Sequence, residues 1–260
     1  MIGILHIGSV TLYGLAGALL GVSLARNARR LPAIASAIVA IGLLLHGLAL
    51  VDYTSTWEQL PLVGLGPSLS TLAFLTGVGS LIAATFGHAS TVGLVLVPVV
   101  AVLTGIAEYV GIAPTGASLD WFVLHVIFAF IGLVGLTVAF AAGLMYLIQY
   151  RQLKSKRFGN VFRFFPPLET LDRLGRRGLL LGFPFLTLSL VLGWAWTTTA
   201  NASPDAGKLA WVAVSWLAFV GAILARAGEG RRPERGALVS VVGFIVVVTV
   251  YVIMRAQATH

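Results

Sequence analysis

Eight stretches of about 20 residues with almost no charged side chain dominate this sequence, and each is long enough to cross a bilayer as a helix. They cover residues 4–24, 32–51, 67–86, 91–110, 122–150, 178–198, 209–226 and 237–254. The chain is 58% hydrophobic and 10% charged, which leaves too little polar surface for a protein surrounded by water. Because the apolar stretches are long and do not alternate with polar residues, they indicate helices rather than strands. The sequence therefore predicts an all-α, polytopic membrane helix bundle, with residues 1–260 as a single domain.

The basic residues orient this predicted bundle in the membrane. The longest polar stretch, from Arg151 to Arg177 (RQLKSKRFGNVFRFFPPLETLDRLGRR), carries eight basic residues against two acids. When the loops are assigned to alternate sides, fifteen of the 17 lysines and arginines fall on one side, and Lys208 and Arg255 fall on the other. Basic loops stay in the cytoplasm, so we expect both chain termini on the outer side. No basic stretch precedes the first apolar run, which argues against a cleavable signal peptide.

Composition and motifs also exclude several functions. The net charge of +8 is spread over helix ends and does not form one patch, which argues against nucleic-acid binding. The sequence contains no cysteine, so thiolate metal sites and disulfides are excluded. It has no HExxH or GxxxxGK[ST] motif, and small-residue spacings such as Gly17 to Gly21 are typical of helix packing. No acid–base pair or activated nucleophile is evident, so we do not expect an enzyme. A permease is less favoured because the predicted midplane lacks polar groups.

Two histidines inside apolar runs are the first candidates for a site. His46 lies six residues before Asp52, roughly 9 Å below the outer interface, and His125 lies four residues after Trp121, roughly 6 Å deep. Two imidazoles at similar depth on different helices suit the two axial positions of a haem iron. The alternative is that each ring only bonds a neighbouring helix, and the sequence leaves both interpretations open. Glu108, near the outer end of its run, is either an interfacial carboxylate or a polar partner for a bound group.

Aromatic residues gather at the same predicted side. The tryptophans at outer helix ends or loops are Trp57, Trp121, Trp194, Trp196 and Trp211. A shelf for a porphyrin and an ordinary interfacial aromatic belt would both place tryptophans there. Composition does not separate the two interpretations.

Several motifs together resemble the membrane-bound cytochrome c assembly proteins of the CcsA/HemX type, with the YpjD-like inner-membrane proteins as the nearest group. One segment, LLLHGLAL, is similar to the LxxHxxAL segment of that family. The helix that starts with LH and runs into LKSKR is similar to the helix of that family that starts with LH and runs into an LKxKR loop. FPPLETLDRL followed by GFPFLTLSLVLGW resembles PPLExLxRL and GFxxLTLxLxxG. The end, from SWLAFVGAILARAGEGRRPERG onward, resembles the last two helices and their basic turn. The similarity covers nearly the whole chain.

This resemblance implies a haem-handling protein of cytochrome c biogenesis in a bacterial inner (cytoplasmic) membrane. His46 and His125 match the motif positions of the family, and His260 stands about where fuller members carry a histidine after the last helix. The implied cofactor is a non-covalent b-type haem held by His46 and His125, with Trp121, Trp194, Trp211 and His260 around it. Fuller members have a WGxxWxWDPKE stretch where this sequence reads TTTANASPDAGK, and LHxR where it reads Leu224-Ala225-Arg226. The tryptophan-rich motif is therefore degenerate here.

A second interpretation is a non-catalytic membrane regulator or assembly subunit. HemX-type relatives are associated with control of glutamyl-tRNA reductase, so the resemblance also implies partners from cytochrome c assembly or haem synthesis. The segment from Arg151 to Arg177 would then dock them, through PPLETLDRL. Alternatively, Leu168, Leu171 and Leu174 form an apolar stripe of an interfacial helix that packs on the bundle. Besides these partners, we expect contact with the lipid bilayer.

Overall fold

The protein was analysed as a computed structural model. The structure describes residues 2–26, 28, 30–62, 64–85, 89–113, 120–156, 164–199, 206–227 and 232–257, and within these it does not describe the side chains of 85, 89, 90, 120, 121, 196–199, 208 and 251–257. The chain divides into two compact units, described separately below. Unit 1 comprises residues 1–118 and 151–170, and unit 2 comprises 119–150 and 171–260.

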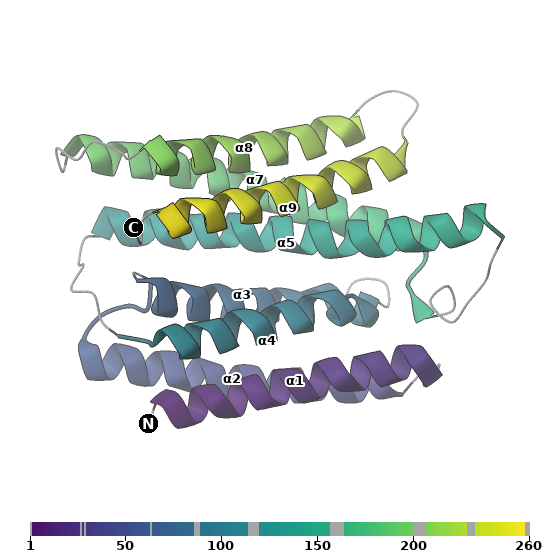
Figure 1. Cartoon of the computed structure of the whole chain (residues 1–260), viewed down its shortest axis with the longest axis horizontal. Helices are drawn as coiled ribbons and strands as arrows, with labels where there is room; N and C mark the ends of the chain where they lie inside the picture. The colour runs from purple at the N-terminus through teal and green to yellow at the C-terminus, as the bar shows by residue number, and fades with distance from the viewer. Residues whose placement is uncertain are drawn as a thin grey trace. The chain divides into compact units, whose positions relative to one another are not determined.

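Long helices make up nearly all of the described structure (Figure 1). Unit 1 contains α1 (Ile2–Arg26), α2 (Leu31–Trp57), α3 (Leu65–Thr85) and α4 (Gly93–Val110), with a short 3₁₀ turn, η1 (Ala89–Val92), before α4. Unit 2 contains most of α5 (Asp120–Lys154) and α7 (Leu168–Thr199), followed by α8 (Ala206–Ala227) and α9 (Pro233–Gln257). Proline stands in the first turn of α2 and begins α9, where its missing N–H costs nothing.

In unit 1, α1 packs along α2 and α4, and α3 packs along α4 (Figure 1). The buried residues of α1 recur every three or four positions, which places Tyr13, Ala16 and Leu20 on one face of the helix. That face meets a core from the other three helices, formed by Ala35, Val39, Leu43, Ala73, Val97 and Val100. A Cβ at Gly17, one of the expected packing glycines, would lie 3.8 Å from Pro98 Cγ, whereas a Cβ at Gly21 would have nothing within 4 Å among the described residues.

In unit 2, four glycines bring the backbones of α5 and α7 into contact. Gly132 and Gly135 of α5 face Gly178 and Gly182 of α7. A Cβ atom at Gly135 would lie 2.5 Å from the Gly178 carbonyl oxygen and 2.8 Å from the Gly182 Cα, so no larger side chain fits. Close approach of this kind is the common way for helices to associate in lipid. The rest of the unit is held together by a core of Leu136, Ala139, Leu179, Leu186, Phe219, Ala222 and Val247.

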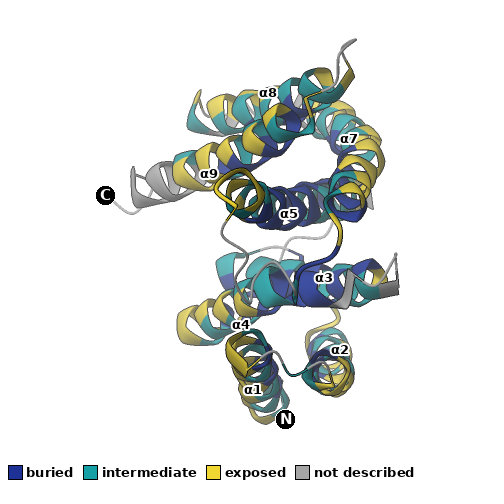
Figure 2. Cartoon of the chain, turned by 90° about the vertical axis from the view of Figure 1, so that its right-hand side faces the viewer, coloured by how far each residue is buried: buried dark blue, intermediate teal, exposed yellow. Residues whose placement is uncertain are grey.

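The exposed surface of the helices is apolar. Figure 2 shows buried and exposed residues along the same helices. Leu44 is 69% exposed, Val191 62% and Leu217 60%, and each belongs to a helix that is also apolar on its buried face. Such a surface is unfavourable in water and suits contact with lipid chains. By length and composition, eight of the described helices are able to cross a membrane.

The predicted membrane spans are confirmed, with differences at their ends. α5 continues past Tyr150 to Lys154, so the basic segment begins inside a helix. α7 begins at Leu168, ten residues before the expected start, because no proline lies between Pro167 and the expected start at Gly178. LETLDRL is therefore the first part of a long helix and not a separate element, and its Leu171 and Leu174 are buried. The single domain over residues 1–260 and the outer location of both termini stay predictions.

Candidate functional site

A chain of buried polar side chains joins all four helices of unit 1. His6 of α1 lies with Nδ1 3.0 Å from Glu108 Oε2 on α4 and with Nε2 2.8 Å from Ser70 Oγ on α3. The same Ser70 hydroxyl oxygen lies 2.9 Å from Nε2 of His46 on α2. His46 Nδ1 lies 3.2 Å from the Tyr13 hydroxyl on α1. We call these five residues the His6–His46 chain.

One arrangement of protons satisfies every link of this chain when Glu108 is ionised and both rings are neutral. The Glu108 carboxylate only accepts, so His6 donates from Nδ1 and its Nε2 accepts from the Ser70 hydroxyl. The Ser70 oxygen then accepts from His46 Nε2, and His46 Nδ1 accepts from the Tyr13 hydroxyl. The two histidines therefore hold opposite tautomers, and both nitrogens of each ring are used.

The His6–His46 chain is buried away from solvent, except at its Glu108 end. His6, Ser70, His46 and Tyr13 are fully buried at 0% exposure, whereas the side chain of Glu108 is 32% exposed. A buried polar group without a partner costs about 1–3 kcal/mol, so the complete pairing explains how these groups are tolerated among apolar helices. The His6–His46 chain therefore links the four helices of unit 1 to one another near the partly exposed Glu108 carboxylate.

Two features of the sequence position the side chains of the His6–His46 chain: the spacing of residues along α1 and a glycine on α2. His6 and Tyr13 are seven residues apart, which is two turns of α1, so both face the interior of the unit. Gly42 of α2 makes room for the Tyr13 ring, because a Cβ at Gly42 would lie 2.8 Å from Tyr13 Cε1. The His46 ring also packs edge to face against Phe74, with ring centroids 5.6 Å apart.

His125 occupies a different environment, in unit 2. Its Nδ1 lies 2.7 Å from the Ser189 carbonyl oxygen and 3.0 Å from the Ser189 hydroxyl oxygen on α7. Because a carbonyl only accepts, Nδ1 carries the proton, and in the neutral ring Nε2 holds the lone pair. Among the residues that the structure describes, Nε2 has no hydrogen-bond partner. The ring is partly exposed.

A glycine on α7 makes room for the His125 ring. A Cβ at Gly193 would lie 2.8 Å from His125 Cε1 and 2.9 Å from Nδ1. Ser189 and Gly193 are one helical turn apart, so together they fix both the height and the orientation of the imidazole. A histidine oriented through Nδ1, with Nε2 left open, is the usual arrangement of a metal-binding imidazole.

The predicted site residues therefore divide between the two units. His46 lies in unit 1 and His125 in unit 2, and their pairing across one iron stays a prediction. Among the described residues, no group of three or more His, Asp or Glu side chains is arranged to hold a metal ion. The His6–His46 chain is a hydrogen-bonded network.

The tryptophans have different surroundings. Trp194, next to Gly193 on α7, is 65% exposed. Trp211 of α8 donates its indole N–H to the Val247 carbonyl of α9 at 3.2 Å and packs on the core of unit 2. Its contacts are those of a packing residue. The side chains of Trp121 and Trp196, and all of His260, lie outside the described residues.

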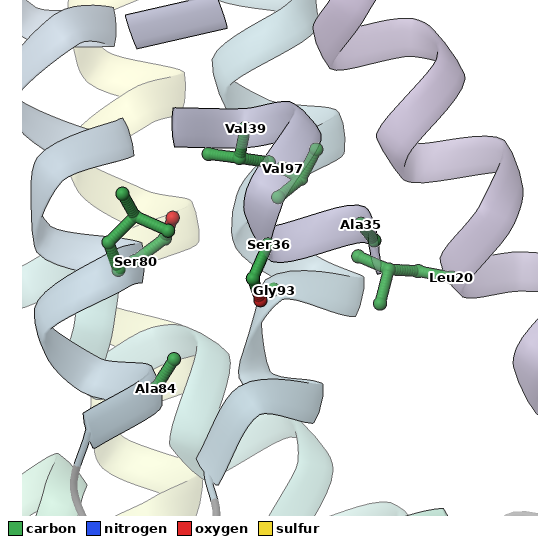
Figure 3. Close-up of a pocket in the computed structure, with 9 residues that line it drawn as sticks. Leu20, Ala35, Ser36, Val39, Ser80, Ala84, Gly93 and Val97 are labelled. Atoms are coloured by element: carbon green, nitrogen blue, oxygen red, sulfur yellow. The ribbon is translucent and has the colours of Figure 1, made fainter. Parts of the chain in front are cut away.

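A small cavity in unit 1 gives no room for a cofactor. It lies between α1, α2, α3 and α4, and its walls include Leu20, Ser36, Val39, Ser80 and Val97 (Figure 3). Its volume of about 10 Å³ is close to that of one water molecule. A haem held by the predicted ligands, His46 and His125, would therefore lie outside this cavity.

Sequence reasoning missed four residues that the structure places at these histidines. Ser70 and Ser189 gave no signal, because serines are common in membrane helices and bond their own backbone. Tyr13 and Gly193 were equally inconspicuous. His6 and Glu108 offered a usable signal, since both are ionisable residues within apolar runs close to the same predicted interface.

Comparisons with known proteins agree with the earlier resemblance. The profile of the family described as cytochrome C assembly protein matches residues 4–260. Cytochrome c biogenesis protein CcsA of Chlamydomonas reinhardtii is 30% identical over 132 residues, 49% of this chain and 36% of the relative. The CcsA proteins of Guillardia theta (30% over 148 residues, 49% of this chain, 48% of the relative) and Nostoc punctiforme (36% over 81 residues, 30% and 23%) are also similar.

These relatives are longer than the part that is matched. The alignments cover less than half the length of each of the three CcsA proteins. No solved structure matches the chain significantly. Because the family profile extends over almost all of the sequence and the described helices suit a membrane, this chain belongs to the cytochrome c assembly protein family as a multi-pass membrane protein.

Proposed function

We propose that this protein handles haem at the membrane during cytochrome c biogenesis, without being an enzyme. Its family, and its similarity to cytochrome c biogenesis proteins of the CcsA type, support a role in that process. A bound haem would supply a redox-active iron with two axial positions for protein ligands. The residues proposed to hold it are His125 and His46, with Trp121, Trp194, Trp211 and His260 around the porphyrin. The proposed group is a non-covalent b-type haem.

The geometry of His125 carries this proposal. The Ser189 carbonyl holds the proton on Nδ1 and leaves the Nε2 lone pair open, while Gly193 gives the ring its space. Trp194 lies beside this glycine with most of its surface exposed. An open, oriented imidazole with a neighbouring aromatic side chain fits an axial haem ligand. His125 therefore fits the group as the structure stands.

His46 can bind haem iron only after it gives up one of its two hydrogen bonds. Both of its nitrogens lie in hydrogen bonds, and its ring is fully buried. To act as a ligand, His46 would release either Ser70 or Tyr13. We therefore propose His125 as the primary ligand and His46 as a second ligand that becomes available when the His6–His46 chain opens.

We place the protein in a bacterial inner membrane with its basic segment in the cytoplasm and both termini outside. The distribution of lysines and arginines supports this orientation. His125 lies near the start of α5, whose other end carries Arg151 and Lys154 in its last turn. The proposed haem site would therefore lie near the outer face.

Absorption spectra of the purified protein test this function. The wild type would be purified in detergent from haem-supplemented cells, and oxidised and dithionite-reduced spectra would be recorded. We expect a Soret band and sharp reduced α and β bands that disappear in His125→Ala. In Ser189→Ala the main-chain carbonyl that accepts from Nδ1 is retained, so this matched control should keep the bands. A wild type without a Soret band would overturn the proposal, as would full haem content in a folded His125→Ala variant.

The second candidate, a regulator that docks partners through the segment from Arg151 to Arg177, receives less support from the structure. Leu171 is 1% exposed and Leu174 5% exposed, so the apolar stripe of PPLETLDRL is used in packing within the chain. Arg173 and Arg176 on the same helix are exposed and would have to form a docking surface. If Glu169→Lys and Arg173→Glu leave the recovery of co-purified proteins unchanged, docking at this segment is excluded.

A further inference from the structure

A buried arginine at the end of α8 has two nitrogen donors without hydrogen-bond partners in the described part of the chain. The side chain of Arg226 is only 7% exposed. Its Nε and Nη1 atoms are buried and have no hydrogen-bond partner among the described residues. The nearest carboxylate oxygen, Asp172 Oδ1 on α7, lies 3.9 Å from Nε, which is too far for a hydrogen bond. Arg226 is thus a buried cation with one distant ion-pair partner, Asp172, and two donors, Nε and Nη1, that make no hydrogen bond within the described structure.

Glycines on two neighbouring helices form the slot that holds this side chain. A Cβ at Gly175 of α7 would lie 3.0 Å from both Nη1 and Nη2 of Arg226. A Cβ at Gly236 of α9 would lie 2.3 Å from its Cγ. Any larger residue at either position would displace the guanidinium, so the ends of α7, α8 and α9 are shaped around it.

A second unpaired polar atom lies at the same end of unit 2. The Oε1 atom of Gln149 on α5 is buried without a hydrogen-bond partner in the described structure, and the residue is 4% exposed. Gln149 lies near the end of α5, whose last turn carries Arg151 and Lys154, and Arg226 lies in the last turn of α8. The distribution of basic residues assigns both helix ends to the inner side. The inner end of the unit therefore offers unsatisfied donors from Arg226 and an unsatisfied acceptor from Gln149.

The charges around this slot are mainly positive. In the described parts of residues 171–177 and 226–236 there are six arginines and two acids, Asp172 and Glu234. The arginines are Arg173, Arg176, Arg177, Arg226, Arg232 and Arg235. This is the end of the helices that the distribution of basic residues assigns to the cytoplasmic leaflet, where anionic lipids are enriched. The ion pair with Asp172 leaves Nε and Nη1 of Arg226 without hydrogen bonds to the described residues. Buried donors of this kind are costly, so they are retained where a further partner satisfies them.

We infer that the inner ends of α7, α8 and α9 bind a phosphate group through Arg226. Phosphate oxygens accept from guanidinium donors, and a charge-assisted bond of this type is about twice as strong as a neutral one. The ligand chemistry is therefore a phosphate or phosphodiester, and its source is an anionic glycerophospholipid such as phosphatidylglycerol or free phosphate. This site is independent of haem binding.

Lipid retention measured by native mass spectrometry tests the inference. Full-length protein would be reconstituted into vesicles of phosphatidylcholine alone, or of phosphatidylcholine with phosphatidylglycerol, then extracted and analysed. We expect the wild type to retain phosphatidylglycerol. The amount retained by Arg226→Gln should be at least about tenfold smaller. Arg226→Lys keeps the charge but loses the planar set of donors, so its retention should be intermediate. The matched control, Arg235→Gln, removes an exposed arginine and should retain as much as the wild type.

The two possible sources of phosphate are separated in detergent without added lipid. Inorganic phosphate that raises the unfolding temperature of the wild type more than that of Arg226→Lys would identify a general phosphate site. Stabilisation by phosphatidylglycerol alone would identify a lipid headgroup site, and both results support the inference. Equal lipid retention by the wild type, Arg226→Lys and Arg235→Gln would overturn it. If Arg226→Gln does not fold, Arg226→Lys carries the comparison.

Discussion

At the scale of single residues, the hydroxyl of Ser70 joins three helices of unit 1 through two hydrogen bonds. One oxygen lies 2.8 Å from His6 Nε2 and 2.9 Å from His46 Nε2, so a serine on α3 joins side chains from α1 and α2. The hydroxyl is the smallest group able to donate to one ring and accept from the other. Its removal would leave two buried nitrogens unsatisfied at once.

We therefore expect Ser70→Ala to destabilise the protein by about 1–3 kcal/mol for each nitrogen that loses its partner. Chemical unfolding in detergent measures this change. Ser9→Ala is the matched control: Ser9 is also fully buried in unit 1, but its hydroxyl donates only to the Leu5 carbonyl of its own helix. Its loss should cost less than about 1 kcal/mol. Equal losses in the two variants would show that the Ser70 bridge does not form.

The proton arrangement of the His6–His46 chain gives a separate prediction. With Glu108 ionised, His6 should carry its proton on Nδ1 and His46 on Nε2. Nitrogen-15 spectra of histidine-labelled protein distinguish these tautomers, with His6→Asn and His46→Asn variants to assign the signals. Finding both rings in the same neutral tautomer would contradict this arrangement. His125 should carry its proton on Nδ1, because the Ser189 carbonyl only accepts.

At the scale of helices, close packing in unit 2 depends on the contact between α5 and α7. Gly132 and Gly182 bring the backbones together, since a Cβ at Gly182 would lie 2.9 Å from the Gly132 carbonyl oxygen. Lipid provides no hydrophobic driving force between helices, so the contact area gained by this close approach contributes directly to their association. A methyl group at the crossing would separate the two helices over several turns.

Gly135→Ala should therefore destabilise unit 2 by about 1–3 kcal/mol, because its Cβ would lie 2.5 Å from the Gly178 carbonyl oxygen. Thermal unfolding in detergent measures the loss. Gly14→Ala serves as the control, since Gly14 also lies inside a helix but has nothing within 4 Å of its Cβ position. That variant should be neutral or slightly more stable, owing to the higher helix propensity of alanine. A neutral Gly135→Ala would show that the helices are not in backbone contact.

At the scale of the whole molecule, the absence of cysteine makes the predicted orientation easy to test. Ser55 at the end of α2 is exposed and lies at the predicted outer side, whereas Arg232 before α9 is exposed at the predicted inner side. In intact cells, a membrane-impermeant maleimide should label Ser55→Cys, and it should label Arg232→Cys only after permeabilisation. The opposite pattern would invert the topology and move His125 to the cytoplasmic half.

Much of this architecture followed from the sequence because lipid imposes few alternatives. Each apolar run had to become a helix, and the eight runs did. The ends were less predictable: α7 starts at Leu168, since helix propensity and the burial of Leu171 outweighed the charges that suggested a loop. The partners of the histidines were not predictable. Which of many serines faces His46 or His125 depends on helix rotation, which hydropathy alone does not fix.

The glycine crossing also determines how much length change these helices tolerate. His125 stands seven residues before Gly132, and Ser189 stands seven residues after Gly182, so equal distances on antiparallel helices bring the imidazole to its carbonyl. Deleting one residue within 126–131 would rotate His125 by about 100° about the axis of α5. The ring would then face away from Ser189 even though every contact at the crossing survived. This stretch should accept exchanges of side chain far more readily than changes in length.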